Sequence, residues 1–208
     1  MKRRLANAAA ALLLIAAATS AQEKSNYSVD PARSKVDIHV YKEGVFKAFG
    51  HDHEIAAKEL AGQAQFDPAK IDQSTVSLKI PTKSITVIDP GESEKDRHEV
   101  QATMEGEKVL DVAKFPEITF TSTSVTSAKK TPDGWELTLA GKLNLHGVEK
   151  PVSFPLHVRA DARELRGEGE LSILQTDYGI TPIKVGGGSV KVKDKLKITF
   201  NIVAAADH

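Results

Sequence analysis

Two histidines one residue apart are the side chains of this sequence best placed for metal chemistry. His51 and His53 form an H-x-H pair, and residues i and i+2 of an extended strand point to the same side. Two imidazoles can therefore converge on one ion. A third ligand can come from any of four residues near or beyond the pair: His98, Asp96, Glu99 or His39. Three such ligands plus water suit zinc or copper(II), so a metal site at His51, His53 and His98 is one hypothesis. The alternative hypothesis is that His51 and His53 are solvated at the start of a strand and bind no metal.

Catalytic motifs are otherwise missing from the sequence. It has no cysteine, which excludes a thiolate nucleophile, a redox CxxC pair and a cysteine-based zinc site. It contains no G-x-S-x-G elbow and no H-E-x-x-H helix, and Gly186–Gly188 precedes a strand, so it indicates a turn and no phosphate cradle. A metal-assisted hydrolase with Asp96 or Glu99 as the base is the one enzymatic alternative. We expect a protein that is not an enzyme and needs no cofactor.

Composition places the chain among ordinary soluble globular proteins. Its 208 residues are 40% hydrophobic and 27% charged, which is typical of one domain and excludes a disordered chain or a protein with several membrane spans. Lys plus Arg and Asp plus Glu both number 28, so there is no basic excess for binding nucleic acid.

Residues 1–21 have the features of a cleaved export signal. Lys2, Arg3 and Arg4 precede an uncharged run from Ala8 to Ala18, and small residues end at Ala21. A signal anchor is the alternative, but the run is short against the roughly 20 residues that span a bilayer. We predict cleavage after Ala21 and a domain of residues 22–208 with 25 basic and 28 acidic residues. The mature chain should have no membrane span and be periplasmic if its source is Gram-negative.

Hydrophobic residues alternate along most of the remaining chain, as in half-buried strands. Seven segments show the pattern: 35–41, 76–80, 118–120, 135–145, 152–158, 165–173 and 190–202. Strands and helices do not alternate regularly along the chain, which predicts an antiparallel sheet. Only Ser93 to Val112 lacks alternation, and there we expect one or two short helices interrupted near Gly106. Both a barrel and a sandwich satisfy this strand count.

One twelve-residue segment resembles a known family. Gly141 to Val152 (GKLNLHGVEKPV) is similar to the strand-turn-strand signature G-x-L-x-L-x-G-V-x-K-P-V of YceI-like proteins. The resemblance covers residues 27–203. Further similar segments occur in the expected order on both sides of the signature: 27–31, 34–36, 84–85, 96–98, 114–120 and 177–180. The resemblance implies an extended, lipocalin-like antiparallel β-barrel that encloses a polyisoprenoid or a similar long apolar lipid, with no catalytic residues.

The strand periodicity and the resemblance differ on the interior of the domain. Inward side chains of a small barrel ordinarily fill it, so periodicity alone favours a packed core. The resemblance instead implies an open lumen with ten aliphatic and aromatic ligand-binding residues: Val36, Ile38, Val40, Leu78, Ile80, Phe120, Leu137, Leu139, Leu143 and Phe154. The oligomeric state, a homodimer included, stays open at this point.

Overall fold

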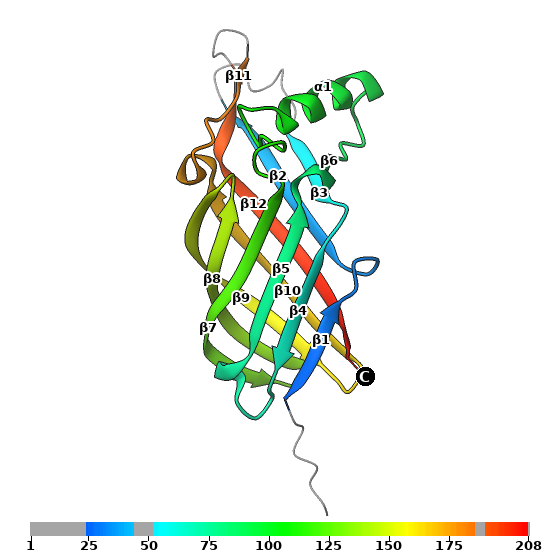
Figure 1. Ribbon diagram of the computed structural model, residues 1–208, viewed down its shortest axis with the longest axis vertical. Helices are drawn as coiled ribbons and strands as arrows, with labels where there is room; N and C mark the ends of the chain where they lie inside the picture. The colour runs from blue at the N-terminus through cyan, green and yellow to red at the C-terminus, as the bar shows by residue number, and fades with distance from the viewer. Residues whose placement is uncertain (1–23, 44–51, 186–189, 208) are drawn as a thin grey trace, which may run out of the picture.

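The fold is a closed antiparallel β-barrel with additional strands and one helix, as predicted (Figure 1). The computed structural model describes residues 24–43, 52–185 and 190–207. The strands are β1 (Ser25–Val29), β2 (Lys35–Glu43), β3 (His53–Ala57), β4 (Ala61–Phe66), β5 (Thr75–Pro81), β6 (Ile85–Val87), β7 (Glu117–Thr131), β8 (Gly134–Leu145), β9 (Val148–Ala160), β10 (Glu164–Leu174), β11 (Lys184–Val185) and β12 (Val190–Ala206). The helices are α1 (Glu94–Glu105) and the 3₁₀ turns η2 (Ile71–Gln73), η3 (Thr82–Ser84) and η4 (Gln175–Tyr178).

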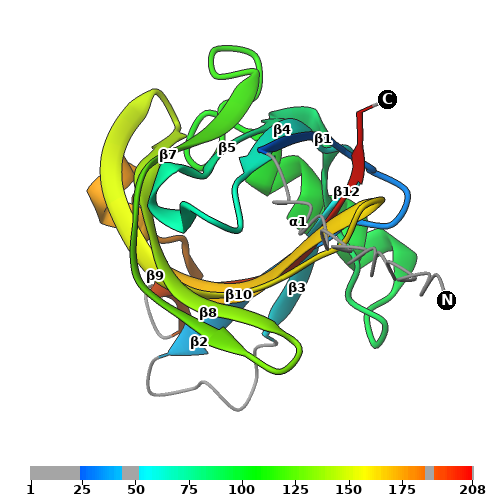
Figure 2. The same ribbon diagram turned by 90° about the horizontal axis from the view of Figure 1, so that it is seen from below.

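Pairing between β1 and β12 closes the barrel. The strand order is β1-β4-β5-β7-β8-β9-β10-β12, and Tyr27 of β1 lies opposite Ala206 at the end of β12. Seen from below, these strands form a ring (Figure 2). The earlier part of β12 pairs with β2, which continues the sheet through β3 to β6. The long β12 therefore joins the barrel to a three-stranded extension, on the side where α1 lies (Figure 1).

Both termini of helix α1 lie where the sequence predicts them. Ser93 caps the N-terminus by accepting a hydrogen bond from the backbone N–H of Asp96 (3.1 Å), and Gly106 is the C-cap. Beyond Gly106 the chain forms hydrogen-bonded turns, such as Asp111 N–H to the carbonyl of Gly106 (3.0 Å), and no second helix. No helix in the described part of the chain is long and apolar enough to cross a membrane.

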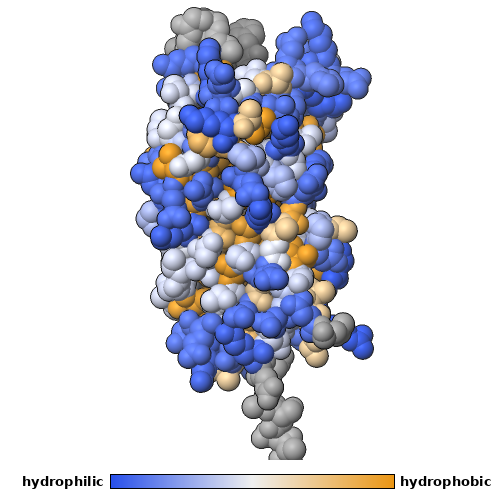
Figure 3. Space-filling model, viewed as in Figure 1, coloured by the Kyte–Doolittle hydropathy of each residue, from blue (hydrophilic) through white to orange (hydrophobic). Residues whose placement is uncertain are grey.

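Two clusters of buried side chains occupy opposite ends of the barrel. We call the first the packed end; its core includes Tyr27, Phe66, Leu139, Val158 and Ala204. The second, the helix end, includes Ile55, Val87, Met104, Leu110 and Tyr178. On the outside, polar residues alternate with the inward ones, and the face shown in Figure 3 is largely hydrophilic, with hydrophobic residues in a broken central strip.

Candidate functional site

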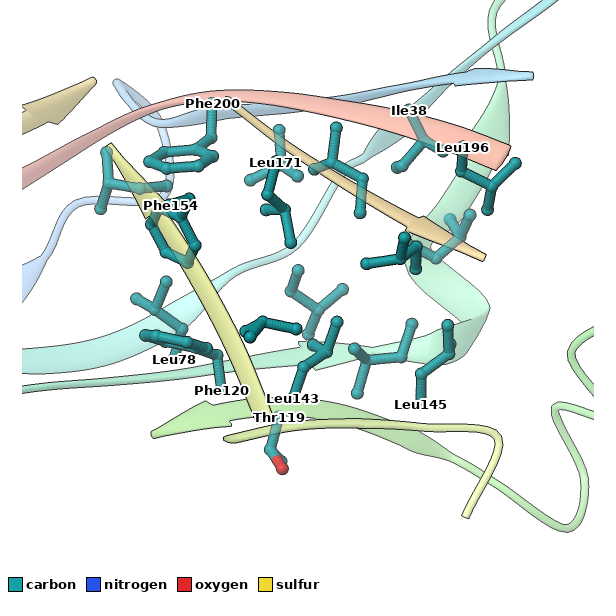
Figure 4. A pocket seen from close by; sticks show the side chains of 18 of the residues that line it. Ile38, Leu78, Thr119, Phe120, Leu143, Leu145, Phe154, Leu171, Leu196 and Phe200 are labelled. Carbon is teal, nitrogen blue, oxygen red and sulfur yellow. The ribbon is translucent and has the colours of Figure 1, made fainter. Parts of the chain in front are cut away.

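The lumen of the barrel contains a cavity of about 610 Å³. Its wall is formed by aliphatic and aromatic side chains from β2, β5, β7, β8, β9, β10 and β12, together with Val100 and Met104 of α1. Polar residues that line it include Glu99, Thr103, Gln175, Gln65 and Arg166. Figure 4 shows Leu143, Phe154 and Leu196 pointing into one common space, whereas the hydroxyl of Thr119 points away.

All ten residues predicted for the lumen lie in the wall of this cavity. Ile38, Leu78 and Leu143 point inward yet are only half-buried, because they border open volume. The packed interior that periodicity favoured is therefore wrong. One cause is on β10, where Gly167 has no side chain to fill the lumen and a Cβ there would meet only Leu156, at 3.5 Å. Whether the ten residues bind a ligand remains a prediction.

Three phenylalanines from different strands project into the lumen and belong to the packed-end cluster. The ring centroids of Phe120 and Phe154 are 5.7 Å apart, and those of Phe154 and Phe200 are 5.5 Å apart. Two glycines make room for them: a Cβ at Gly141 would lie 2.5 Å from the Phe120 ring, and one at Gly169 would lie 2.9 Å from Phe200. Glycine in these strands thus makes room for an aromatic section of the lumen wall within the packed-end cluster.

At the helix end, α1 is attached to the edge strand β6 by one glutamine. Gln101 Oε1 accepts a hydrogen bond from the backbone N–H of Val87 (2.9 Å), and Gln101 Nε2 donates to the carbonyl of Ile85 (2.9 Å). The side-chain amide thus makes the hydrogen bonds that a neighbouring strand would otherwise make with the edge of β6. Arg97 Nη1 adds a hydrogen bond to the carbonyl of Asp89 (3.2 Å). These contacts hold Met104 against the lumen.

The predicted metal ligands have separate surroundings. His53 lines the cavity and its Nδ1 contacts Asp89 Oδ2 at 2.6 Å, whereas His98 is exposed on α1. His39 Nε2 lies 3.4 Å from Thr199 Oγ1. The carboxylates proposed as ligand or base are also engaged, since Asp96 accepts from Ser93 Oγ (2.7 Å) and Glu99 lies 3.8 Å from Lys95 Nζ.

Across residues 24–43, 52–185 and 190–207, no group of three or more His, Asp or Glu side chains could hold a metal ion. His51 lies outside the described residues. A metal site at His51, His53 and His98 therefore remains a prediction.

His146 in the signature turn is less exposed than its place in a hairpin suggests. Its ring lies 4.4 Å from that of Phe115, and its Nδ1 is 3.1 Å from the carbonyl oxygen of Tyr178. This histidine is partly enclosed because positive φ values at His146 (52°) and Gly147 (74°) turn the hairpin tightly against Phe115. His157, in contrast, lies on the outer face of β9, with Nδ1 2.8 Å from Glu136.

Sequence reasoning missed three polar residues at the helix end. Asp89 precedes Pro90 and Gly91, which together indicate only a turn, yet it is 4% exposed. Gln175 is 5% exposed, and its Nε2 donates to the carbonyl of Lys193 (2.9 Å). Gln101 belongs to a segment that indicated no more than a helix. Their partners are distant in sequence, so no local pattern could identify them.

A closed, lipocalin-like barrel with an apolar lumen defines the class of protein. The family model for the YceI-like domain matches residues 27–204, so the chain belongs to the YceI-like family. A UPF0312 protein of Shewanella denitrificans is 32% identical over 141 residues, which is 65% of this chain and 67% of that protein. Protein YceI of Salmonella arizonae is 35% identical over 130 residues, 60% and 61% of the two chains. This chain thus spans about two thirds of the length of the first curated relative and 61% of the length of the second.

Solved structures share the fold. BcnA of Burkholderia cenocepacia has a TM-score of 0.66 at 25% identity and covers 84% of this chain and 98% of its own. A polyisoprenoid-binding domain from Saccharophagus degradans, described as implicated in plant cell wall breakdown, has a TM-score of 0.60 at 17% identity, covering 87% and 98%. These likenesses confirm the barrel.

Proposed function

We propose that this chain is a non-enzymatic binding protein that carries a long apolar lipid, a polyisoprenoid or one like it, in the lumen of its barrel. The observation that carries the proposal is the cavity of about 610 Å³ with an almost wholly apolar wall. Burial of each CH₂ group stabilises a bound chain by about 0.8 kcal/mol, so such a wall suits a ligand with a long hydrocarbon part. The name of the Saccharophagus degradans domain supports polyisoprenoids as the lipid class.

Export to the periplasm belongs to the same proposal. It rests on the basic and apolar segments of residues 1–21, which lie outside the described residues. N-terminal sequencing of the protein recovered from its host should begin at Gln22. Full-length chain in the cytosol or in the membrane would contradict cleavage after Ala21.

Native mass spectrometry of the protein from its own host tests lipid carriage. We expect a non-covalent adduct that extraction into organic solvent identifies as a lipid, and delipidated protein should bind it again. A protein that never carries or takes up any lipid would contradict the proposal.

A tryptophan substitution in the lumen should distinguish an open cavity from a packed core. Leu143 borders the open volume, so Leu143→Trp should reduce lipid binding at least about ten-fold at little cost in stability. Leu174→Trp is the matched control, because Leu174 is 41% exposed on the same barrel. In a packed core, the larger side chain would instead cost roughly 1–3 kcal/mol of unfolding free energy. Such a loss with unaltered lipid binding would contradict the assignment of Leu143 to the lumen.

A further inference from the structure

His53 lines the lumen at the helix end and forms a polar pair with Asp89, which lies outside the cavity lining. Residues of β3 and β6 lie opposite each other, with Ile55 facing Val87, and both of these side chains are buried at the helix end. Two residues before Ile55 and two residues after Val87, His53 lies beside Asp89, with Nδ1 and Oδ2 2.6 Å apart. The register of two short strands thus produces a pair that is 36 residues apart in the sequence.

Asp89 fixes the orientation of the imidazole. Its carboxylate is 4% exposed, and Oδ1 accepts a hydrogen bond from the backbone N–H of Glu54 in β3. Since Oδ2 can only accept, the hydrogen between the two side chains belongs to His53 Nδ1 whether the ring is neutral or charged. A buried carboxylate held by backbone therefore determines which ring nitrogen remains for a ligand.

Nε2 of His53 is the ring nitrogen that remains available for a ligand. Within the described parts of the chain, no hydrogen bond or ion pair engages it, although the residue lines the cavity and its side chain is 23% exposed. Other polar residues of this region are already engaged: the hydroxyl of Thr103 donates to the carbonyl of Glu99 (2.9 Å), and Gln175 donates to Lys193. A polar atom beside apolar wall costs free energy unless it gains a partner.

We propose that His53 Nε2 hydrogen-bonds the polar head of the bound lipid, and that this head is a hydroxyl group. This inference rests on the proposed function and adds the chemistry of the ligand's polar end. A hydroxyl can donate to bare Nε2 or accept from Nε2–H, so it pairs with the ring in both proton states. A carboxylate or a carbonyl can only accept, and therefore pairs only with the charged ring. The ligand is thus a lipid alcohol, with its head at the helix end and its hydrocarbon chain toward Phe120, Phe154 and Phe200.

Competition binding with two matched lipids tests the assignment. Delipidated wild-type protein, His53→Phe and His39→Phe are titrated with phytol and with phytane, which has the same branched carbon skeleton but neither the hydroxyl nor the double bond, so each lipid's affinity is compared between variants. We expect His53→Phe to weaken phytol binding by roughly ten-fold, because the buried hydroxyl loses its partner, and to change phytane binding by less than about two-fold. His39→Phe, the same substitution on β2 outside the cavity lining, should leave both affinities unchanged.

Two further variants test whether hydrogen bonding by residue 53 and its orientation by Asp89 determine phytol affinity. His53→Gln retains a hydrogen-bonding amide and should recover part of the phytol affinity lost in His53→Phe. Asp89→Asn keeps the imidazole but loosens its orientation, so it should weaken phytol binding and spare phytane. Thermal melts confirm that each variant is folded.

Other outcomes overturn the proposal in distinguishable ways. Equal losses of phytol and phytane binding in His53→Phe would assign the ring to packing alone. A fatty acid whose affinity depends on His53 more strongly than that of phytol would replace the alcohol by an acid. Failure of wild-type protein to bind any of these lipids would instead contradict the proposed function itself.

Discussion

The two ends of the barrel are built from different kinds of side chain. At the packed end, Phe66 and Trp135 meet edge to face with centroids 5.1 Å apart, and Tyr27 is 1% exposed. The cavity borders both ends, but the buried side chains of the helix end are mainly aliphatic, and one short helix attached through Gln101 covers that end.

This difference indicates a division of roles between stability and access. The packed end combines dense contacts with the β1–β12 pairing that closes the ring, so it should be the last part to open. The helix end depends on a few polar contacts between α1 and β6 and can open at lower cost. We infer that a ligand enters and leaves past α1.

Truncating Phe66 should give the largest loss of stability. Phe66→Ala removes a ring that is 4% exposed and in contact with Trp135, so we expect the unfolding free energy to fall by about 3–5 kcal/mol. Leu196→Ala in the lumen wall should cost less than about 2 kcal/mol, because Leu196 is only half-buried in the folded protein. Urea unfolding measures both. Similar losses in the two variants would mean that the helix end is packed as densely as the other.

Detaching α1 should have a smaller, local effect. Gln101→Ala leaves the N–H of Val87 and the carbonyl of Ile85 without their partners, which should cost about 1–3 kcal/mol. Amide exchange at Val87 should accelerate, and bound lipid should dissociate faster, while amides of β1 and β12 keep their protection. Gln63→Ala on the exposed face of β4 is the control. Unchanged lipid dissociation would place the entry route elsewhere.

Much of the barrel could be predicted from the sequence because its longest strands alternate clearly. In β2 and β8 inward Val, Ile and Leu residues identify one face, and Ser93 and Gly106 bound the helix. The interval Ala61–Phe66 was missed as a strand because Ala, Gly and Gln carry little strand propensity. Its assignment depends on pairing with β1 and β5, which no local pattern reveals.

The site was predictable in its apolar wall and not in its polar contacts. Inward residues follow from alternation, so Ile38 and Leu143 could be assigned to the interior without the structure. Whether that interior is open depends on how eight strands close around Gly167 and Gly169, a property of the whole ring. Asp89 meets His53 only through the β3–β6 register, and a histidine pair alone could not indicate that partner.

Tyr178 offers a pH test of the helix end. Burial raises the pKa of its phenol above the ordinary value, because the charged form is disfavoured in the core. In the unfolded chain the pKa is about 10, so this contribution to stability is complete below that pH and is lost as pH rises through the higher folded pKa. We expect wild-type protein to lose more stability between pH 9 and about pH 11 than Tyr178→Phe, measured by urea unfolding. Identical alkaline losses would mean that Tyr178 ionises without cost in the folded protein.

The smallest effect should come from an ion-pair group near the packed end. Arg33 Nε lies 2.7 Å from Asp30 and Arg33 Nη1 lies 2.6 Å from Glu164. Hydrogen bonds from Arg33 are the main cause that lowers the pKa of both carboxyl groups. Their stabilising contribution is therefore present above the unfolded pKa values, about 3.9 and 4.3, and is lost as pH falls through the lower folded values.

Arg33→Gln should raise the pKa of Asp30 and of Glu164 toward their ordinary values, as followed by NMR titration of the carboxyl carbons. Asp161 is the internal reference, because its pKa is lowered by the backbone N–H groups of Arg163 and Glu164 and should stay unchanged. Since the group is exposed to solvent, its effect on the unfolding free energy near neutral pH should be slight and should diminish further in high salt. A loss comparable to that of Phe66→Ala would mean that charge, and not aromatic packing, secures this end of the barrel.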